Sequence, residues 1–238
     1  MTTDASEAAV PPHSPSAALE NDRSLVFEQP LNERMRTFLR LDFLYSQALY
    51  HNEMASQWGT RAAVSSLIDI LAITSRSDVR SDALKELDRQ LTLLGEFQSK
   101  PGVDANRLKT LIANLSRLRS ELLNAGVANL QPLKDSEFLN AIKHRSSIPG
   151  GTCEFDLPDY LCWLSQPDEV RVRAFNEWLT MLRPLCDAVS ELIWLTRQNG
   201  RTRQETAPNG NFTITFDREN PLQLLASRCR PRRASTRR

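Results

Sequence analysis

The order of apolar and polar residues predicts a chain made mostly of amphipathic helices. Between residues 31 and 198, large apolar residues recur at intervals of three and four, which places them on one face of a helix. The first run follows Asn32, a residue type that caps first turns, and the last contains Pro184, where we expect a kink or a break. The predicted helices begin after Asn32, Thr60, Asp78 and Asp104, and then cover residues 136–146, 157–163 and 168–198.

Shorter apolar runs near both ends of the chain predict strands. In NFTITFD, residues 211–217, phenylalanine and isoleucine alternate with threonine, which is typical of a strand with one buried face. The run PLQLLAS, residues 221–227, predicts a second strand. Residues 24–28 predict an early strand that stops before Pro30 and joins the late ones. The fold class is therefore mainly α with a small antiparallel β-domain, an α+β fold with about seven helices.

Changes of composition divide the chain into four parts. The first part, residues 1–23, is rich in alanine, serine, threonine and proline and has few large apolar groups, so we expect a disordered leader. The helical pattern predicts an α-helical domain over residues 31–199, whereas residues 24–30 and 200–227 predict the small β-domain. Residues 228–238 form an arginine-rich tail.

The net charge of the chain conceals an asymmetry. The formal net charge is +1, yet the last thirteen residues hold six arginines and no acidic residue, so the preceding part is net acidic. Because an out-of-frame reading of GC-rich DNA produces such acid-free Arg, Ala, Pro and Ser runs, we expect a frameshift or truncation, with a genuine basic tail as the alternative. No apolar run approaches the roughly 20 residues that span a bilayer, and no signal peptide opens the chain. We therefore expect a cytoplasmic protein without a membrane segment.

The Gly150-Gly151 pair, in the segment HRSSIPGGTCEFDLP, is the first candidate for chemistry. A phosphate-binding loop places its glycines after a strand and before a helix, whereas here a predicted helix precedes them and an extended stretch follows. Cys153 would need a histidine to become a nucleophile, and only two histidines fall within the predicted folded part. These patterns favour a structural corner, Pro149-Gly150-Gly151, where the glycines adopt positive φ angles. We expect no catalytic residue, no metal site and no cofactor.

Basic residues provide the second candidate, a surface that binds acidic groups. Arg36 and Arg40 are four residues apart on the first predicted helix and therefore share one face, about 40° apart. Lys143, His144 and Arg145 close the fifth predicted helix. Together these cations suit an acidic peptide or a carboxylate. Scattered solubilising charge is the alternative that the spacing leaves open.

Three longer segments of the chain resemble the ZapD family of bacterial cell-division proteins. The resemblance extends in the same order and with similar spacing from about Leu25 to about Leu225. The segments are FEQPLNERMRTFLRLDFL (27–44), VRSDALKELDRQ (79–90) with PGVD (101–104), and SIPGGTCEFDLP (147–158).

This resemblance implies a non-enzymatic partner of FtsZ, the tubulin-like GTPase of the division ring. Family members are expected to be homodimers, with an α-helical domain and a smaller β-domain, that bind the C-terminal tail of FtsZ and cross-link its filaments at midcell. A dimer supplies the two sites that a cross-linker needs. We hypothesise that Arg36 and Arg40, in the first matching segment, contact acidic groups of the tail, with Arg80, Lys143 and Arg145 as further contributors.

Two other functions stay open from the residues alone. A nucleic-acid-associated protein that acts through its basic tail predicts DNA binding that depends steeply on salt and is lost when residues 226–238 are deleted. The scarcity of aromatic residues near the basic ones disfavours single-stranded nucleic acid. A phosphate-binding enzyme at the Gly-Gly corner predicts nucleotide binding that a Gly150→Ala/Gly151→Ala change abolishes.

The family continues with further β-structure after the strand at 222–227, whereas this chain reads CRPRRASTRR, so binding residues of that region are not carried over.

Overall fold

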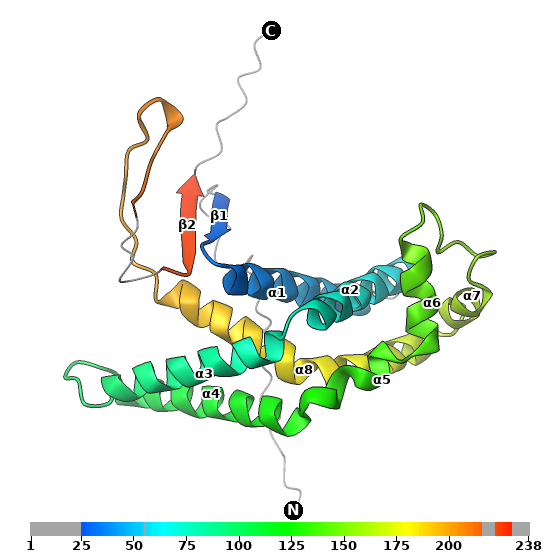
Figure 1. Ribbon diagram of the computed structural model, residues 1–238, viewed down its shortest axis with the longest axis horizontal. Helices are drawn as coiled ribbons and strands as arrows, with labels where there is room; N and C mark the ends of the chain where they lie inside the picture. The colour runs from blue at the N-terminus through cyan, green and yellow to red at the C-terminus, as the bar shows by residue number, and fades with distance from the viewer. Residues whose placement is uncertain (1–24, 55, 216–221, 230–238) are drawn as a thin grey trace, which may run out of the picture.

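Helices make up most of the structure, a computed structural model that describes residues 25–54, 56–215 and 222–229 (Figure 1). Within these ranges, the α-helices are α1 (Glu33–Asn52), α2 (Gln57–Arg76), α3 (Val79–Phe97), α4 (Ala105–Ala125), α5 (Gln131–Lys134), α6 (Glu137–Ser146), α7 (Pro158–Leu164) and α8 (Asp168–Gln198). The same ranges contain two strands, β1 (Leu25–Pro30) and β2 (Leu224–Cys229). They also contain two short 3₁₀ turns, η1 (Val127–Leu130) and η2 (Pro208–Gly210). The mainly α, α+β class is confirmed. The predicted leader at 1–23 and most of the arginine-rich tail, residues 230–238, lie outside the described ranges.

The first four helices, α1 to α4, start after residues whose side chains cap them. The Asn32 side chain accepts a hydrogen bond from the Met35 amide at 2.8 Å, and Asp78 and Asp104 cap α3 and α4 in the same way. The predicted start after Thr60 is wrong, because Ser56 caps α2 four residues earlier. Its hydroxyl accepts from the Gly59 amide at 3.0 Å, which lets the helix begin at Gln57.

The core lies where two helical hairpins meet α8. Helices α1 and α2 form one hairpin, α3 and α4 form the other, and the long α8 contacts α1, α3 and α4 (Figure 1). Phe38, Leu67, Leu115, Phe175 and Leu192 each have at most 1% of their surface exposed. Burying such a side chain contributes about 1.5–3 kcal/mol, so these residues hold the helices together.

Helix α8 runs through Pro184 without interruption, so of the kink or break expected at that residue the break is excluded. Proline removes one backbone hydrogen bond, the one that would reach the carbonyl of Thr180. Thr180 is exposed, so water can satisfy that carbonyl, while Leu182 and Leu185 are buried on either side of the proline. Packing of these neighbours stabilises the continuous helix.

The sheet consists of β1 and β2, which pair antiparallel with Leu25 opposite Cys229 and Pro30 opposite Leu224. The predicted pairing of an early with a late strand is therefore confirmed, although β1 continues through Pro30 and β2 covers residues 224–229 instead of 221–227. The strand predicted at 211–217 is wrong for residues 211–215, which belong to no strand; residues 216 and 217 lie outside the described ranges. Alternation makes a segment suitable for a sheet, but a strand forms only where a partner supplies the hydrogen-bond ladder.

Ion pairs and hydrogen bonds join the sheet to the helices. Glu28 of β1 accepts two hydrogen bonds from the Arg197 guanidinium of α8, both at 2.8 Å, and these bonds raise the pKa of Arg197. The Leu31 amide donates to the Gln223 carbonyl at 3.0 Å, next to the start of β2. The two strands thereby have a fixed position over the N-terminal end of α1 (Figure 1).

Across the ranges that the structure describes, no helix has the combination of length and apolar character that crossing a membrane requires.

Candidate functional site

Arg36 and Arg40 lie on the outer face of α1, in the half of the helix nearest the sheet. Arg40 is exposed and forms no salt bridge within the described part of the chain. Arg36 is half-exposed and is paired with the neighbouring Glu33, one turn earlier on the same helix. Arg40 is therefore the cation of this pair that an incoming carboxylate can contact without displacing an existing partner.

Two exposed aromatic side chains continue the same face of α1, and sequence reasoning missed them. Phe43 and Tyr50 are 64% and 61% exposed. Because successive residues turn by about 100° around a helix, they fall on the side that carries Arg36 and Arg40. The sequence could have indicated their exposure, because both lie outside the apolar stripe that includes the buried Phe38. We call Arg36, Arg40, Phe43 and Tyr50 the α1 face.

Lys143 and Arg145 are exposed at the end of α6, at the opposite end of α1 from the arginines (Figure 1). Helix α6 lies next to the beginning of α2, which follows directly after the end of α1. Twelve residues separate Arg40 from the last residue of α1, a rise of about 18 Å. The structure therefore does not bring the two sets of cations into one patch. Arg145 also pairs with Asp156 at 3.4 Å.

Arg80 lies at a third place, where it caps a neighbouring helix. Its Nη2 donates to the carbonyls of Leu122 and Leu123, at 3.1 and 3.4 Å, at the C-terminal end of α4. A cation is favourable there because the last carbonyls of a helix lack partners and carry partial negative charge. These contacts give Arg80 a structural role and leave less of its guanidinium for a ligand.

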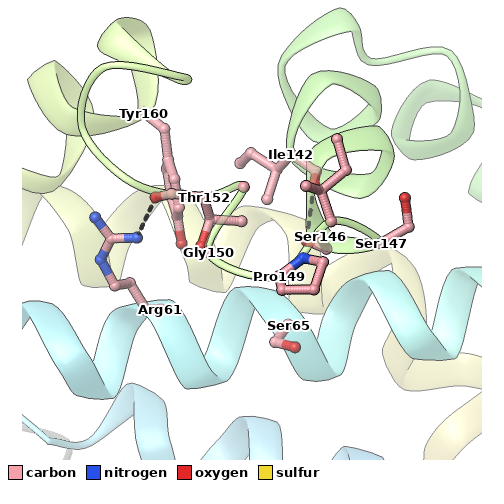
Figure 2. Close-up of a pocket in the computed structure, with 11 residues that line it drawn as sticks. Arg61, Ser65, Ile142, Ser146, Ser147, Pro149, Gly150, Thr152 and Tyr160 are labelled. Atoms are coloured by element: carbon pink, nitrogen blue, oxygen red, sulfur yellow. Dashed lines mark hydrogen bonds between the residues drawn. The ribbon is translucent and has the colours of Figure 1, made fainter.

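The Pro149-Gly150-Gly151 corner joins α6 to α7 and lines a cavity of about 420 Å³ (Figure 2). Gly150 has a φ of 74°, as expected, but Gly151 does not have a positive φ. Gly151 is required for another reason: a Cβ there would lie 2.3 Å from the Arg145 carbonyl oxygen. The extended stretch expected after the corner is wrong, because Cys153 to Asp156 form turns in which the Leu157 amide donates to the Cys153 carbonyl at 3.2 Å.

Arg61 of α2 forms one wall of this cavity, and no pattern in the sequence indicates its role. Its Nη1 donates to the Thr152 carbonyl at 2.8 Å (Figure 2). Its guanidinium lies 5.0 Å from the ring centre of Tyr160 and 5.6 Å from that of Trp58. In the sequence Arg61 looks like any solubilising cation near a helix start, and only the fold brings it against α7.

Tyr160 is held in place by an aromatic cluster that includes Phe138 and Trp163. Its ring centre is 5.9 Å from that of Phe138, edge to face, and 6.1 Å from that of Trp163, stacked. Burial raises the pKa of Tyr160 to about 12, although the nearby Arg61 charge lowers it somewhat. At neutral pH the hydroxyl is therefore protonated and can donate a hydrogen bond.

A model of the ZapD family, described as a cell division protein, matches residues 39–235. The chain belongs to the ZapD family. The cell division protein ZapD of Methylococcus capsulatus is 35% identical over 201 residues, which cover 84% of this chain and 79% of that protein. The proteins of the same name from Janthinobacterium sp. and Bordetella petrii are 35% and 34% identical and cover 79% of this chain and 75% of their own lengths.

The ZapD-family match includes Arg40, the cations of α6 and the Gly-Gly corner, whereas Arg36 precedes it. The match also continues into residues 228–235, so the expected departure from the family there stays a prediction. The relatives carry the name of a cell division protein and not that of an enzyme. The resemblance seen in the sequence is thus confirmed at the level of family.

Proposed function

We propose that this chain binds the C-terminal tail of FtsZ and cross-links FtsZ filaments in the cytoplasm at midcell, without catalysis. Membership of a family named for cell division supports the process. The observation that supports contact with the acidic FtsZ tail is the state of Arg40, which is exposed on α1 and has no carboxylate partner among the described residues.

The α1 face suits an acidic segment that also carries apolar side chains. Arg40 offers a guanidinium fork to a carboxylate, and Arg36 can do the same if it exchanges Glu33 for the ligand. Phe43, next along the face, offers exposed apolar area. Removing one charge-assisted contact costs about 1.5–3 kcal/mol, or about tenfold or more in affinity.

Cross-linking requires that one particle holds two filaments. A homodimer meets this requirement, because symmetry duplicates the α1 face, and binding at two sites gives an avidity that exceeds the affinity of either. We therefore propose that the active form is a homodimer.

A double variant, Arg36→Ala/Arg40→Ala, tests the proposal by co-sedimentation with FtsZ filaments and by anisotropy of a labelled FtsZ tail peptide. We expect a loss of at least tenfold in peptide affinity and the disappearance of bundles. Arg107→Ala/Lys109→Ala is the matched control, because it also removes two exposed cations, from α4. Unchanged pelleting and unchanged peptide affinity in the double variant would reject the assignment of these arginines.

A further inference from the structure

We propose that the cavity between α2, α6 and the Gly-Gly corner binds a carboxylate attached to an apolar group. This inference does not depend on FtsZ, since it concerns residues other than the α1 face. The cavity, of about 420 Å³, is large enough for a single amino-acid-sized acid.

The charge of the cavity matches a single negative charge. Of the 11 residues that line it, Arg61 alone is ionised at neutral pH, and no carboxylate is among them. Arg61 forms no salt bridge within the described residues, and only one of its contacts is a hydrogen bond, to the Thr152 carbonyl. One uncompensated guanidinium fits a monocarboxylate better than a phosphate dianion, which would need more cations.

Tyr160 supplies an independent sign of a ligand. The residue is only 3% exposed, it lines the cavity, and its hydroxyl has no hydrogen-bond partner in the part of the chain that the structure describes. That hydroxyl is open to the cavity, where a carboxylate oxygen would accept its hydrogen bond in place of water. The aromatic cluster around Phe138 and Trp163 fixes the ring, so this donor is already oriented.

The rest of the lining and the rim favour an organic acid over an inorganic anion. Ser65 adds a hydroxyl group to the wall, whereas the hydroxyls of Ser146 and Ser147 already donate to the carbonyls of Ile142 and His144 (Figure 2). Ile148, in the lining, is 48% exposed, and Trp58, beside Arg61, is 80% exposed. Exposed apolar groups next to an unpaired cation provide a surface for the apolar part of the ligand.

Titration of the ¹⁵N-labelled full chain with N-acetylphenylalanine, followed by NMR at constant ionic strength, tests the proposal. We expect saturable shifts of the Gly150, Gly151 and Thr152 amides. N-acetylphenylalaninamide, which lacks the carboxylate, should leave these amides unmoved. 3-Phenylpropionate distinguishes the two possible sources of the carboxylate, a free organic acid and a peptide. If it binds as well as N-acetylphenylalanine, the ligand is a free organic acid; weaker binding indicates a peptide carboxylate.

Two variants identify the groups that bind. Arg61→Gln should weaken binding at least tenfold, and Tyr160→Phe, which keeps the ring and therefore the cluster, should weaken it about two- to tenfold. Lys109→Ala, which removes an exposed cation of α4 outside the lining, is the control and should bind as the natural chain does. Equal shifts with the acid and the amide, undiminished binding by Tyr160→Phe, or tighter binding of inorganic phosphate would overturn the proposal.

Discussion

Glu86 of α3 joins three parts of the fold, and its replacement by glutamine should be the most informative change in the core. Its carboxylate is 2% exposed and is contacted by Arg34 of α1 at 2.9 Å. Arg89 of α3 donates to both of its oxygens, with Nε at 3.0 Å from each, and Gln223, next to β2, donates at 3.3 Å. Glu86→Gln keeps the volume but removes the charge and one acceptor oxygen.

The size of the effect follows from which groups remain buried. Removing one member of a fully buried ion pair costs about 3–5 kcal/mol, because the other charge is left without water. Here the side chains of Arg34 and Arg89 are 31% and 45% exposed, so water can solvate both after the change. We therefore expect a loss of about 1–3 kcal/mol in the free energy of unfolding at pH 7.

The dependence on pH gives a second readout of the same carboxylate. Burial raises the pKa of Glu86, but hydrogen bonds from Arg89 and Gln90 and the nearby charge of Arg34 outweigh burial, so its pKa lies below the ordinary value of 4.5. A carboxyl whose pKa is lowered by folding contributes stability that is complete above its unfolded pKa and disappears as pH falls through its folded pKa. The difference between the natural chain and Glu86→Gln should therefore shrink below about pH 4.5.

Urea unfolding followed by circular dichroism at pH 7 and at pH 3.5 measures both effects. Asp88→Asn, on the same helix and 54% exposed in its pair with Arg119, is the control and should cost at most about 1 kcal/mol. A Glu86→Gln protein as stable as the natural chain at pH 7, or a difference that does not change with pH, would refute the reasoning.

Two further changes test the corner and the attachment of the sheet. Gly151→Ala places a Cβ against the Arg145 carbonyl, so the backbone must shift. A thermal unfolding scan should show about 1–3 kcal/mol of destabilisation. An unchanged unfolding midpoint would contradict the close approach. Arg197→Gln removes the two bonds to Glu28 and should speed hydrogen exchange of β1 amides about five- to thirtyfold, for a loss of about 1–2 kcal/mol in partly exposed surroundings. Arg203→Gln, whose ion pair is with a residue only two positions away, should leave that exchange unaltered.

Local signals predicted the helices well, because their caps and apolar stripes lie within a few residues of each other. Asn32, Asp78 and Asp104 cap helices as their positions indicated. The start of α2 was misplaced because Thr60 and Ser56 are both capping types, and only the backbone shows which hydroxyl accepts. The strand expected at 211–217 failed because pairing is a property of two distant segments, and alternation within one segment does not report it.

The candidate sites were only partly predictable, for the same reason. Arg36 and Arg40 share a face because one helix holds both, and four residues of spacing are enough to establish that. Whether they meet Lys143 depended on how α1 and α6 pack, and the fold keeps them apart. The cavity wall formed by Arg61 and Tyr160 joins residues of α2 and α7, so no spacing in the sequence could indicate it.

The pairing of β1 with β2 also sets an order of events during synthesis. Roughly 200 residues separate Leu25 from its partner Cys229, so β1 leaves the ribosome long before β2 exists. At about 5–20 residues per second, that delay is about 10–40 s, time enough for the helical hairpins to form. During this delay, β1 presents an apolar strand edge to other chains. The edge carries Leu25, Val26 and Phe27, which stay largely exposed even in the folded chain. The step most open to misassembly is therefore the last one, in which β1 pairs with β2.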